Sequence, residues 1–388
     1  MRRAAIAAAA VALASTDCRS AGQASSTSVD AAMTADAATS IVARTDASTD
    51  TRAAEVSRPS RPLPSADHLS APFRGTKARG FVAVTNTVRT ASIEARRTSV
   101  SITRGDTLDL AKPVLVASFT KLWTAVATLR MVERGELSLD DTVKDTLPAL
   151  ASRPWASSTI RELLTHTSLV PELDDRGGYY RRGDVDFSAP ATALARYVPR
   201  DWTEKRGVYK YRNSELAIVG AILAERSKMP ADRVLAREVF DPAAMTHAGL
   251  FVTTAPPDLD LSPVGLLRPQ NFFTAGAGYA SASDLLAFFE ALAGTGLLTE
   301  ASKALLFDGA AERDRGALGC WAFSFALPDG GTTRLVERPG SFGNVRLFSA
   351  FFPDEGRAVV AWTGDGVDIA RPRTGKGIGY ALARAALE

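Results

Sequence analysis

Ser118 and Lys121 stand three residues apart in the stretch Val116–Lys121, and together they can form an activated nucleophile. The residues after Ser118 contain no Pro or Gly until Gly135, and their apolar side chains recur at close to 3.6 residues, which predicts a helix. Positions i and i+3 share one face of a helix, so the serine hydroxyl and the lysine amine can meet. A buried lysine with a lowered pKa can accept the serine proton. The pair therefore predicts an activated serine for acyl transfer.

We expect Ser118 at the N-terminus of this helix. A serine caps a helix well there, and free N–H groups at that end stabilise developing negative charge. The S-x-x-K spacing also arises by chance, and a capping serine beside a solvated lysine is the simple structural alternative. The context of the pair has to decide between the two.

Tyr211 and Asn213 form a second candidate group. They stand two apart just before a helix predicted over residues 215–227, so in an extended backbone their side chains point the same way. A tyrosine can carry a proton, and an amide can orient a substrate carbonyl. The structural alternative for Asn213 is a helix cap, a role that Ser214 can also fill.

His166 is one of three histidines and follows a capping box made by Thr159 and Glu162. No Asp or Glu stands at a spacing that would orient it as in a serine–histidine triad, although a partner distant in the sequence is compatible with the pattern. We therefore predict that His166 packs at the end of its helix, near the pocket, and is not the catalytic base.

The composition fits a large folded enzyme. Of 388 residues, 46% are hydrophobic and 23% charged, enough for one large or two ordinary domains. The net charge is only +3 and no basic stripe alternates with aromatic residues, so we expect no nucleic-acid partner. No apolar run of transmembrane length follows the N-terminus.

Residues 1–18 are typical of an export signal, because two arginines precede an alanine-rich core with a small-x-small cleavage pattern. The alternative is an alanine-rich helix of the mature protein. We predict an exported protein of the periplasm or cell envelope. Cys18 suggests a lipoprotein with a membrane anchor, but Asp17 stands where a lipobox has a small residue. The other cysteine is Cys320, so we expect no native disulfide.

Residues 19–71 are rich in Ala, Ser, Thr and Asp and contain no aromatic side chain, which predicts a disordered tether. We expect the catalytic domain over residues 72–388, with order beginning near Gly75 and a turn at Asn86 between the first two strands. Strands are predicted at residues 80–85, 91–95, 319–327, 332–338, 345–352 and 358–363, and helices after residues 118, 159, 215, 285 and 377. The aromatic-rich segment 171–206 is either a wall of the substrate cleft or a surface insertion.

Three motifs stand in order along the chain: Ser118-x-x-Lys121, Tyr211-x-Asn213 and Arg338-Pro339-Gly340. Between them lie the stretches LLTHTS at 163–168 and AGAGYASASD at 275–284. In this combination, residues 75–388 resemble the serine beta-lactamase and penicillin-binding protein superfamily. The resemblance is greatest to its branch of class C beta-lactamases, D-alanyl-D-alanine carboxypeptidases and esterases.

The resemblance implies an acyl-enzyme mechanism without a metal or an organic cofactor. In it Ser118 is acylated, Lys121 accepts its proton, and Tyr211 shuttles protons to the leaving group. The backbone N–H groups of Ser118 and Ser341 would form the oxyanion hole. The substrate-binding residues implied are Asn213, Arg338, Gly340 and Ser341.

Arg338 departs from the family pattern, in which the third motif usually begins with Lys or His. Arginine keeps the positive charge and can grip a carboxylate with two hydrogen bonds, but it cannot release a proton. Pro339 has neither a hydroxyl nor an N–H group, which suits an edge strand. Leu169 also stands where relatives often have Gly. These changes weaken the expectation of efficient beta-lactam hydrolysis more than that of the fold.

We therefore predict an α/β (α+β) protein of the beta-lactamase and transpeptidase type: an antiparallel sheet flanked by helices, plus a mainly helical region, with Ser118 at their junction. It would be a monomeric, exported serine hydrolase acting on an amide or ester in a small-molecule or peptide substrate, for example one derived from the cell wall. Esterase, peptidase and beta-lactamase activities are not separated by the sequence. The alternative is a penicillin-binding-like sensor that acylates slowly or not at all.

Overall fold

The structure is a computed structural model of the chain, and it describes residues 62–89, 93–102, 109–173, 178–200, 205–308, 317–369 and 373–388. The chain separates into two units, Met1–Val56 and Ser57–Glu388, and the fold below is that of the second unit. The predicted export signal and residues 19–61 of the predicted tether lie outside the described residues.

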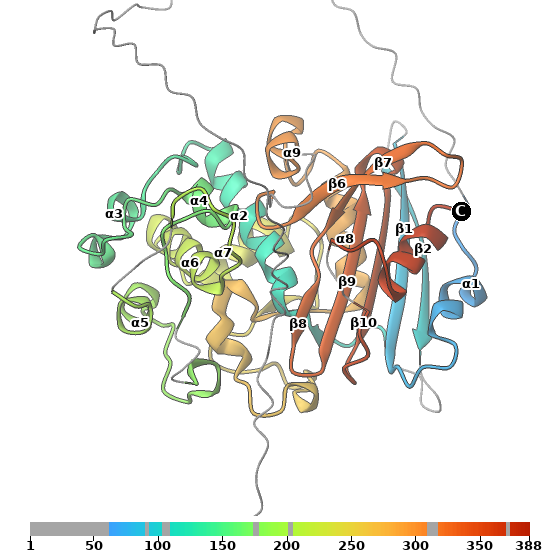
Figure 1. The fold of residues 1–388 in the computed structure, drawn as a ribbon, viewed down its shortest axis with the longest axis horizontal. Coiled ribbons are helices and arrows are strands. Elements are labelled where there is room, and N and C mark those ends of the chain that lie inside the picture. The colour runs from blue at the N-terminus through green and yellow to red at the C-terminus, as the bar shows by residue number, and fades with distance from the viewer. Residues whose placement is uncertain are drawn as a thin grey trace, which may run out of the picture. The chain divides into compact units, whose positions relative to one another are not determined.

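One half of the described fold is a seven-stranded antiparallel sheet (Figure 1). The strand order is β2-β1-β10-β9-β7-β6, and β8 pairs with β9 beside this path. The strands are β1 (Gly80–Arg89), β2 (Ile93–Ile102), β6 (Trp321–Ala326), β7 (Thr332–Glu337), β8 (Gly340–Phe342), β9 (Val345–Phe352) and β10 (Arg357–Thr363). The prediction of an antiparallel sheet built from early and C-terminal strands is confirmed.

Two details of the predicted strands are wrong. Asn86 does not turn the chain, because β1 continues to Arg89 and Asn86 pairs with Arg96 on one side and Arg357 on the other. A polar residue that suggested a turn is thus held inside a strand with neighbours on both edges. The short strand β8 was not predicted; it follows Pro339, whose missing N–H interrupts the ladder after β7.

The two faces of the sheet are covered by different helices. Along β1, Phe81 and Ala83 belong to the larger core shared with α8 (Ala282–Ala293), whereas Val82 and Val84 pack in a second cluster. This alternation follows from the two-residue period of a strand. The second cluster contains side chains of α1 (Ala66–Ser70) and α10 (Ile378–Ala385).

The predicted boundary between tether and domain at residue 71 is wrong for residues 62–71. Helix α1 lies within them, capped by Ser65, and its Leu69 is fully buried in the second cluster. Arg357 also donates a hydrogen bond from Nη1 to the Pro62 carbonyl at 3.1 Å. Leu69 and the following Phe73 pack in this cluster, and Leu63 packs against it, so a few apolar side chains dock a segment whose polar composition predicted disorder.

The other half is mainly helical, as predicted (Figure 1). Its central helices are α2 (Thr120–Glu133) and α6 (Asn213–Ser227), and both are buried over most of their length. Further helices are α3 (Val143–Thr146), α4 (Ile160–Leu164), α5 (Pro190–Tyr197), α7 (Ala231–Leu235) and α9 (Glu300–Leu306); a small sheet contains β3 (Val114–Leu115), β4 (Gly249–Leu250) and β5 (Gly278–Ala280). No helix in the described ranges combines the length and apolar character needed to cross a membrane.

Candidate active site

Ser118 lies in a single 3-10 turn, Ala117–Phe119, that leads into α2. The preceding Ala117 has a φ of 49°, in the left-handed region that a residue with a Cβ adopts only at a cost. The Thr120 hydroxyl donates to the Ala117 carbonyl at 2.7 Å and so helps to hold this turn. The expected capping role of Ser118 is wrong, because Phe119 occupies the N-cap of α2 and no side chain caps it.

The Ser118 hydroxyl instead meets two candidate proton carriers. Its Oγ lies 2.7 Å from Tyr211 Oη and 3.1 Å from Lys121 Nζ. The i, i+3 contact between Ser118 and Lys121 is thus formed as the spacing predicted. Tyr211 arrives from the segment before α6, 93 residues further along the chain. The fold therefore joins two of the three sequence motifs at one oxygen atom.

Lys121 is completely buried, and its amine lies among three oxygen atoms. Besides Ser118 Oγ, Nζ lies 2.8 Å from Asn213 Oδ1 and 2.6 Å from the Ala275 carbonyl oxygen. Burial, and next the Arg338 cation, hold the pKa of Lys121 well below its usual value. A neutral amine has two N–H groups, which the two carbonyls can accept, and one lone pair. That lone pair is then left for the Ser118 hydroxyl.

The segment carrying Tyr211 and Asn213 is fixed by a carboxylate. The Glu172 side chain accepts hydrogen bonds from the backbone N–H groups of Asn213 at 2.7 Å and of Ser214 at 3.1 Å. These are the first amides of α6, so Glu172 takes the capping role that we expected of Asn213 or Ser214. The Asn213 amide is therefore available to Lys121 and, through Nδ2, to the Tyr180 hydroxyl at 3.0 Å.

Arg338 reaches the same site from the sheet, but it faces inward. The side chain is 1% exposed; Nε donates to the Ser118 carbonyl at 3.0 Å, and Nη2 donates to Tyr211 Oη at 3.0 Å. Its guanidinium also lies over the rings of Tyr211 and Trp321, at 5.2 and 4.7 Å. Nη1 is buried and has no hydrogen-bond partner among the described residues. This geometry does not fit the expected open grip on a substrate carboxylate.

Gly340 and Ser341 lie on β8, next to the turn that contains Ser118. A Cβ on Gly340 would lie 2.1 Å from the Val116 carbonyl oxygen, so only glycine lets the strand approach this closely. Gly340 thus packs against the turn, and its role is one of close approach. The following residue, Ser341, has an exposed side chain on the opposite face of the strand.

Part of the aromatic-rich segment 171–206 does border the site. The Tyr180 ring stacks on Phe272 with centroids 4.2 Å apart, and Phe272 stacks on Phe342 of β8 at 4.9 Å. This aromatic stack runs from Asn213, which Tyr180 contacts, to the residue after Ser341. It supports the interpretation of residues 178–181 as a wall; Trp202 lies outside the described residues.

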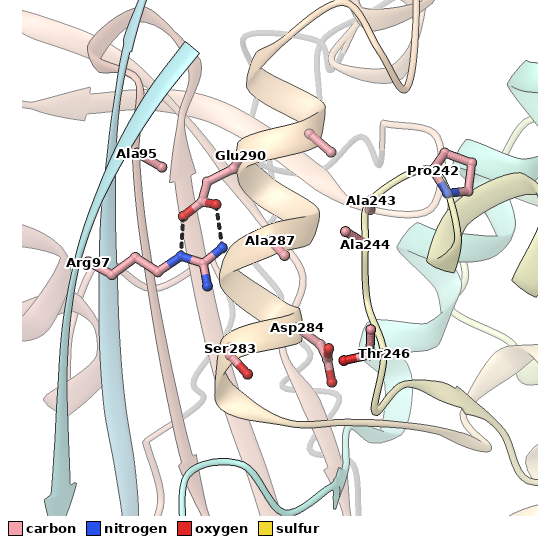
Figure 2. A pocket seen from close by; sticks show the side chains of 11 residues that line it. Ala95, Arg97, Pro242, Ala243, Ala244, Thr246, Ser283, Asp284, Ala287 and Glu290 are labelled. Atoms are coloured by element: carbon pink, nitrogen blue, oxygen red, sulfur yellow. Dashed lines mark hydrogen bonds and ion pairs between the residues drawn. The ribbon is translucent and has the colours of Figure 1, made fainter.

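A separate pocket of about 470 Å³ lies between β2, α8 and residues 242–246, and it contains none of the expected catalytic residues (Figure 2). Arg97 forms two hydrogen bonds with Glu290 there, and Asp284 belongs to the capping box of α8. The polar side chains of this pocket are thus engaged by protein groups. Within the described residues, no cluster of three or more His, Cys, Asp or Glu side chains is placed to hold a metal ion.

A family model described as Beta-lactamase matches residues 75–374. The chain belongs to the beta-lactamase family. The family and the serine hydrolase class predicted from the three motifs are therefore confirmed, with the specificity unresolved. Membership also gives Ser118-x-x-Lys121 and Tyr211-x-Asn213 a family context that the isolated spacing lacked.

Proteins similar to this beta-lactamase family member are named as an esterase, a penicillin-binding protein and an amidohydrolase. Esterase EstB from Burkholderia gladioli is 29% identical over 263 residues, which are 54% of this chain and 65% of the esterase. A penicillin-binding protein from Bacillus halodurans (22% identity, TM-score 0.63) and a D-stereospecific amidohydrolase from Streptomyces (18%, 0.65) share the fold. These structures cover 82% and 84% of this chain, and the match spans 98% of each of theirs. The chain spans 33% and 65% of the length of two curated relatives.

The buried amine leads to a pH prediction. If neutral Lys121 is the base, kcat/KM for a neutral ester rises as pH increases through its lowered pKa and is on its plateau well below the ordinary lysine value of about 10.4. Arg338→Gln removes the nearby cation, so the pKa of Lys121 should increase and the rising limb should move to higher pH. A pH–rate profile of both proteins measures this. A wild-type limb near the ordinary lysine value would contradict a neutral base.

Proposed function

We propose that this chain hydrolyses an amide or ester through an acyl-enzyme on Ser118. The observation that carries the proposal is the position of Ser118 Oγ, within hydrogen-bond distance of both Tyr211 Oη and the buried Lys121 amine. A hydroxyl becomes a competent nucleophile when an adjacent base accepts its proton. Here the base is an amine whose pKa burial lowers, and its two N–H groups have carbonyl partners.

The proposed reaction has two stages. In the first, Ser118 Oγ bonds to the substrate carbonyl carbon while its proton passes to Lys121 Nζ. The oxyanion is held by the backbone N–H groups of Ser118 and Ser341, and the bond to the leaving group breaks as that group receives a proton through Tyr211. In the second stage, water attacks the acyl carbonyl carbon and gives a proton to Lys121 and Tyr211. The bond between that carbon and Ser118 Oγ then breaks, Oγ takes back a proton from this pair, and the acid is released.

We propose further that the substrate is uncharged where it meets the third motif. Arg338 is 1% exposed and its Nε and Nη2 donate to protein oxygens, while Nη1, the nitrogen without a partner among the described residues, is buried. Since a substrate carboxylate would have to lose its hydration to reach a buried guanidinium, neutral esters and amides fit the site better. The names of the Burkholderia esterase and the Streptomyces amidohydrolase agree with these two bond types. A small molecule or a short peptide, including a cell-wall fragment, satisfies this description.

A penicillin-binding-like sensor is the second candidate, and the third motif favours it. Arg338 cannot exchange a proton, and relatives include penicillin-binding proteins. In such a protein the first stage occurs and the second is slow, so the acyl-enzyme persists. The two candidates therefore differ in turnover and share the acylation of Ser118.

We propose that the protein is exported to the cell envelope, on the basis of the two arginines and the apolar core of residues 1–18. Cys18 is the candidate site of a lipid anchor. Cell fractionation with N-terminal sequencing of the mature protein tests export, and Cys18→Ala tests anchoring. A full-length chain recovered from the cytoplasm would contradict export, and unchanged membrane association of Cys18→Ala would contradict the anchor.

Ser118→Ala should abolish hydrolysis of p-nitrophenyl acetate, because no other described hydroxyl lies within hydrogen-bond distance of the buried amine. A serine-reactive phosphonate should add to Ser118 of the wild type, as mass spectrometry of the digested protein can show. Ser283→Ala, which alters an exposed serine of the separate pocket, is the matched control and should behave as wild type. Adducts elsewhere with Ser118 unmodified would refute the assignment. Labelling without turnover would establish the sensor.

Arg338→Ala should lower kcat/KM for neutral and carboxylate-bearing esters by similar factors, about ten- to hundredfold. The variant removes the hydrogen bonds that hold Ser118 and Tyr211, and the reaction of either ester depends on those two residues. Arg373→Ala is the control, because it removes another guanidinium that lies over the Trp321 ring, at 5.5 Å, and leaves the Arg338 bonds to Ser118 and Tyr211 in place. Steady-state kinetics with a matched pair of esters measure the effect. A loss of kcat/KM confined to the carboxylate-bearing ester would contradict this expectation and support the sequence-based prediction that Arg338 binds a substrate carboxylate.

A further inference from the structure

We propose that His166 is a positioning residue that holds Tyr211 against Ser118 by binding the backbone on both sides of it. The inference rests on the proposed role of Tyr211 and assigns a function to a residue that the sequence suggested only as packing. It is carried by the contacts of three parts of His166: its carbonyl, its ring nitrogen Nδ1 and its ring face.

The backbone contacts bracket Tyr211. The His166 carbonyl accepts a hydrogen bond from the Lys210 N–H at 2.8 Å, and Nδ1 lies 3.4 Å from the donating N–H of Arg212. Tyr211 is the residue between these two. The neighbouring Thr167 carbonyl accepts from Gly207 N–H at 2.8 Å, which extends the same attachment. The tyrosine is therefore fixed along the chain by its two neighbours.

The imidazole also supports the phenol ring itself. The ring centroids of His166 and Tyr211 are 4.7 Å apart, and the ring of Tyr209 stands nearly perpendicular to His166 at 5.9 Å. At its other end, the Tyr211 hydroxyl lies 2.7 Å from Ser118 Oγ. Since a hydrogen bond weakens steeply when its geometry changes, a small tilt of the phenol would disturb the contact with the nucleophile.

The imidazole is anchored by a carboxylate that the sequence spacing did not reveal. Glu215 Oε2 lies 2.6 Å from Nδ1, and Glu215 Oε1 accepts from the Ser168 hydroxyl at 2.6 Å. Arg212 Nη1 lies 3.5 Å from the same oxygen. All four side chains are at most 2% exposed. Burial raises the pKa of Glu215 well above its usual value, and a protonated Glu215 can donate to Nδ1, whose single lone pair it then shares with the Arg212 N–H.

His166 does not contact the reacting atoms, which separates positioning from catalysis. Its Nε2 is buried and has no hydrogen-bond partner among the described residues. Burial, and next the Arg338 cation, lowers the pKa of His166 well below its usual value, so the ring is neutral. The ring is neutral, and the one nitrogen with hydrogen-bond partners faces Glu215 and the backbone. These features fit a positioning role for His166.

The backbone of residue 166 allows a matched pair of variants. His166 has a φ of 59°, a conformation that asparagine tolerates better than most residues with a side chain. Asparagine places its Oδ1 where Nδ1 lies, so it can accept from the Arg212 N–H and from protonated Glu215. Glutamine places its amide where Nε2 lies and leaves the Nδ1 position without an acceptor. The two side chains thus share polarity and differ in the atom that the proposal requires.

The test is a double-mutant cycle on p-nitrophenyl acetate. His166→Gln should lower kcat about ten- to hundredfold with KM within about twofold, whereas His166→Asn should retain kcat within about threefold. Each variant is then combined with Tyr211→Phe. Because His166 acts through the Tyr211 hydroxyl, the difference between Asn and Gln should shrink to less than about twofold in that background.

Equal kcat for the Asn and Gln variants, or an Asn–Gln difference of the same size with Tyr211→Phe, would overturn the proposal. Thermal unfolding of every variant shows whether a loss is merely one of stability. Glu238→Gln provides the comparison, since it weakens another buried carboxylate, bound by Arg130 and Arg134 toward the far end of α2, and should leave kcat unchanged. Should the Gln variant not fold, the Asn variant alone must retain activity for the proposal to stand. Turnover by Ser118→Ala would instead refute the proposed function.

Discussion

The constraint on which this structure depends is the burial of one amine. An ammonium group removed from water is costly unless it is fully paired, whereas a neutral amine is tolerated and basic. Lys121 is surrounded by α2, by Asn213 at the start of α6 and by the Ala275 carbonyl, so three segments must meet to enclose it. The same enclosure brings together the proposed nucleophile Ser118, the proposed proton carrier Tyr211 and the Asn213 amide. Packing of the helical half of the molecule therefore keeps this amine buried.

Arg338 completes the electrostatics from the sheet side. A guanidinium is charged at every relevant pH, so it disfavours a second positive charge on Lys121 under all conditions. The same group binds the carbonyl of Ser118 and the hydroxyl of Tyr211, and so it links the strained nucleophile turn to the proton carrier. The family usually has Lys or His here, and both can exchange a proton. This chain has a fixed cation here, and in the structure that cation donates to two oxygens of the protein itself.

Two carboxylates, Glu172 and Glu215, position the two site residues that come from the helical half, Asn213 and Tyr211. Glu172 binds the first amides of α6 and so fixes Asn213, while Glu215, through His166, supports Tyr211. Both carboxylates orient groups that contact Ser118 or Lys121, and such supporting residues decide whether a reacting atom stands within bonding distance. Gly340 has a comparable positioning role on the sheet side. Because it has no side chain, β8 can pack closely against the turn that contains Ser118.

What the sequence determined by itself was local. The helix after Ser118, the capping box at Thr159 and the alternating C-terminal strands were predicted correctly, because caps and periodicity depend on residues a few positions apart. The combination of spaced motifs was enough for the family as well. Asn86 and the segment around Leu69 were misinterpreted, since their conformations depend on strands and an apolar face supplied by distant parts of the chain.

Only the tertiary structure decided which residues of the site contact one another. Lys121 meets Asn213 across 92 positions, His166 meets Glu215 across 49, and Arg338 meets Ser118 across 220. Residue types at such separations give no signal of pairing until folding brings them together. The inward direction of Arg338 is the clearest example: its charge was evident from the sequence, but burial and two protein acceptors decided what that charge serves.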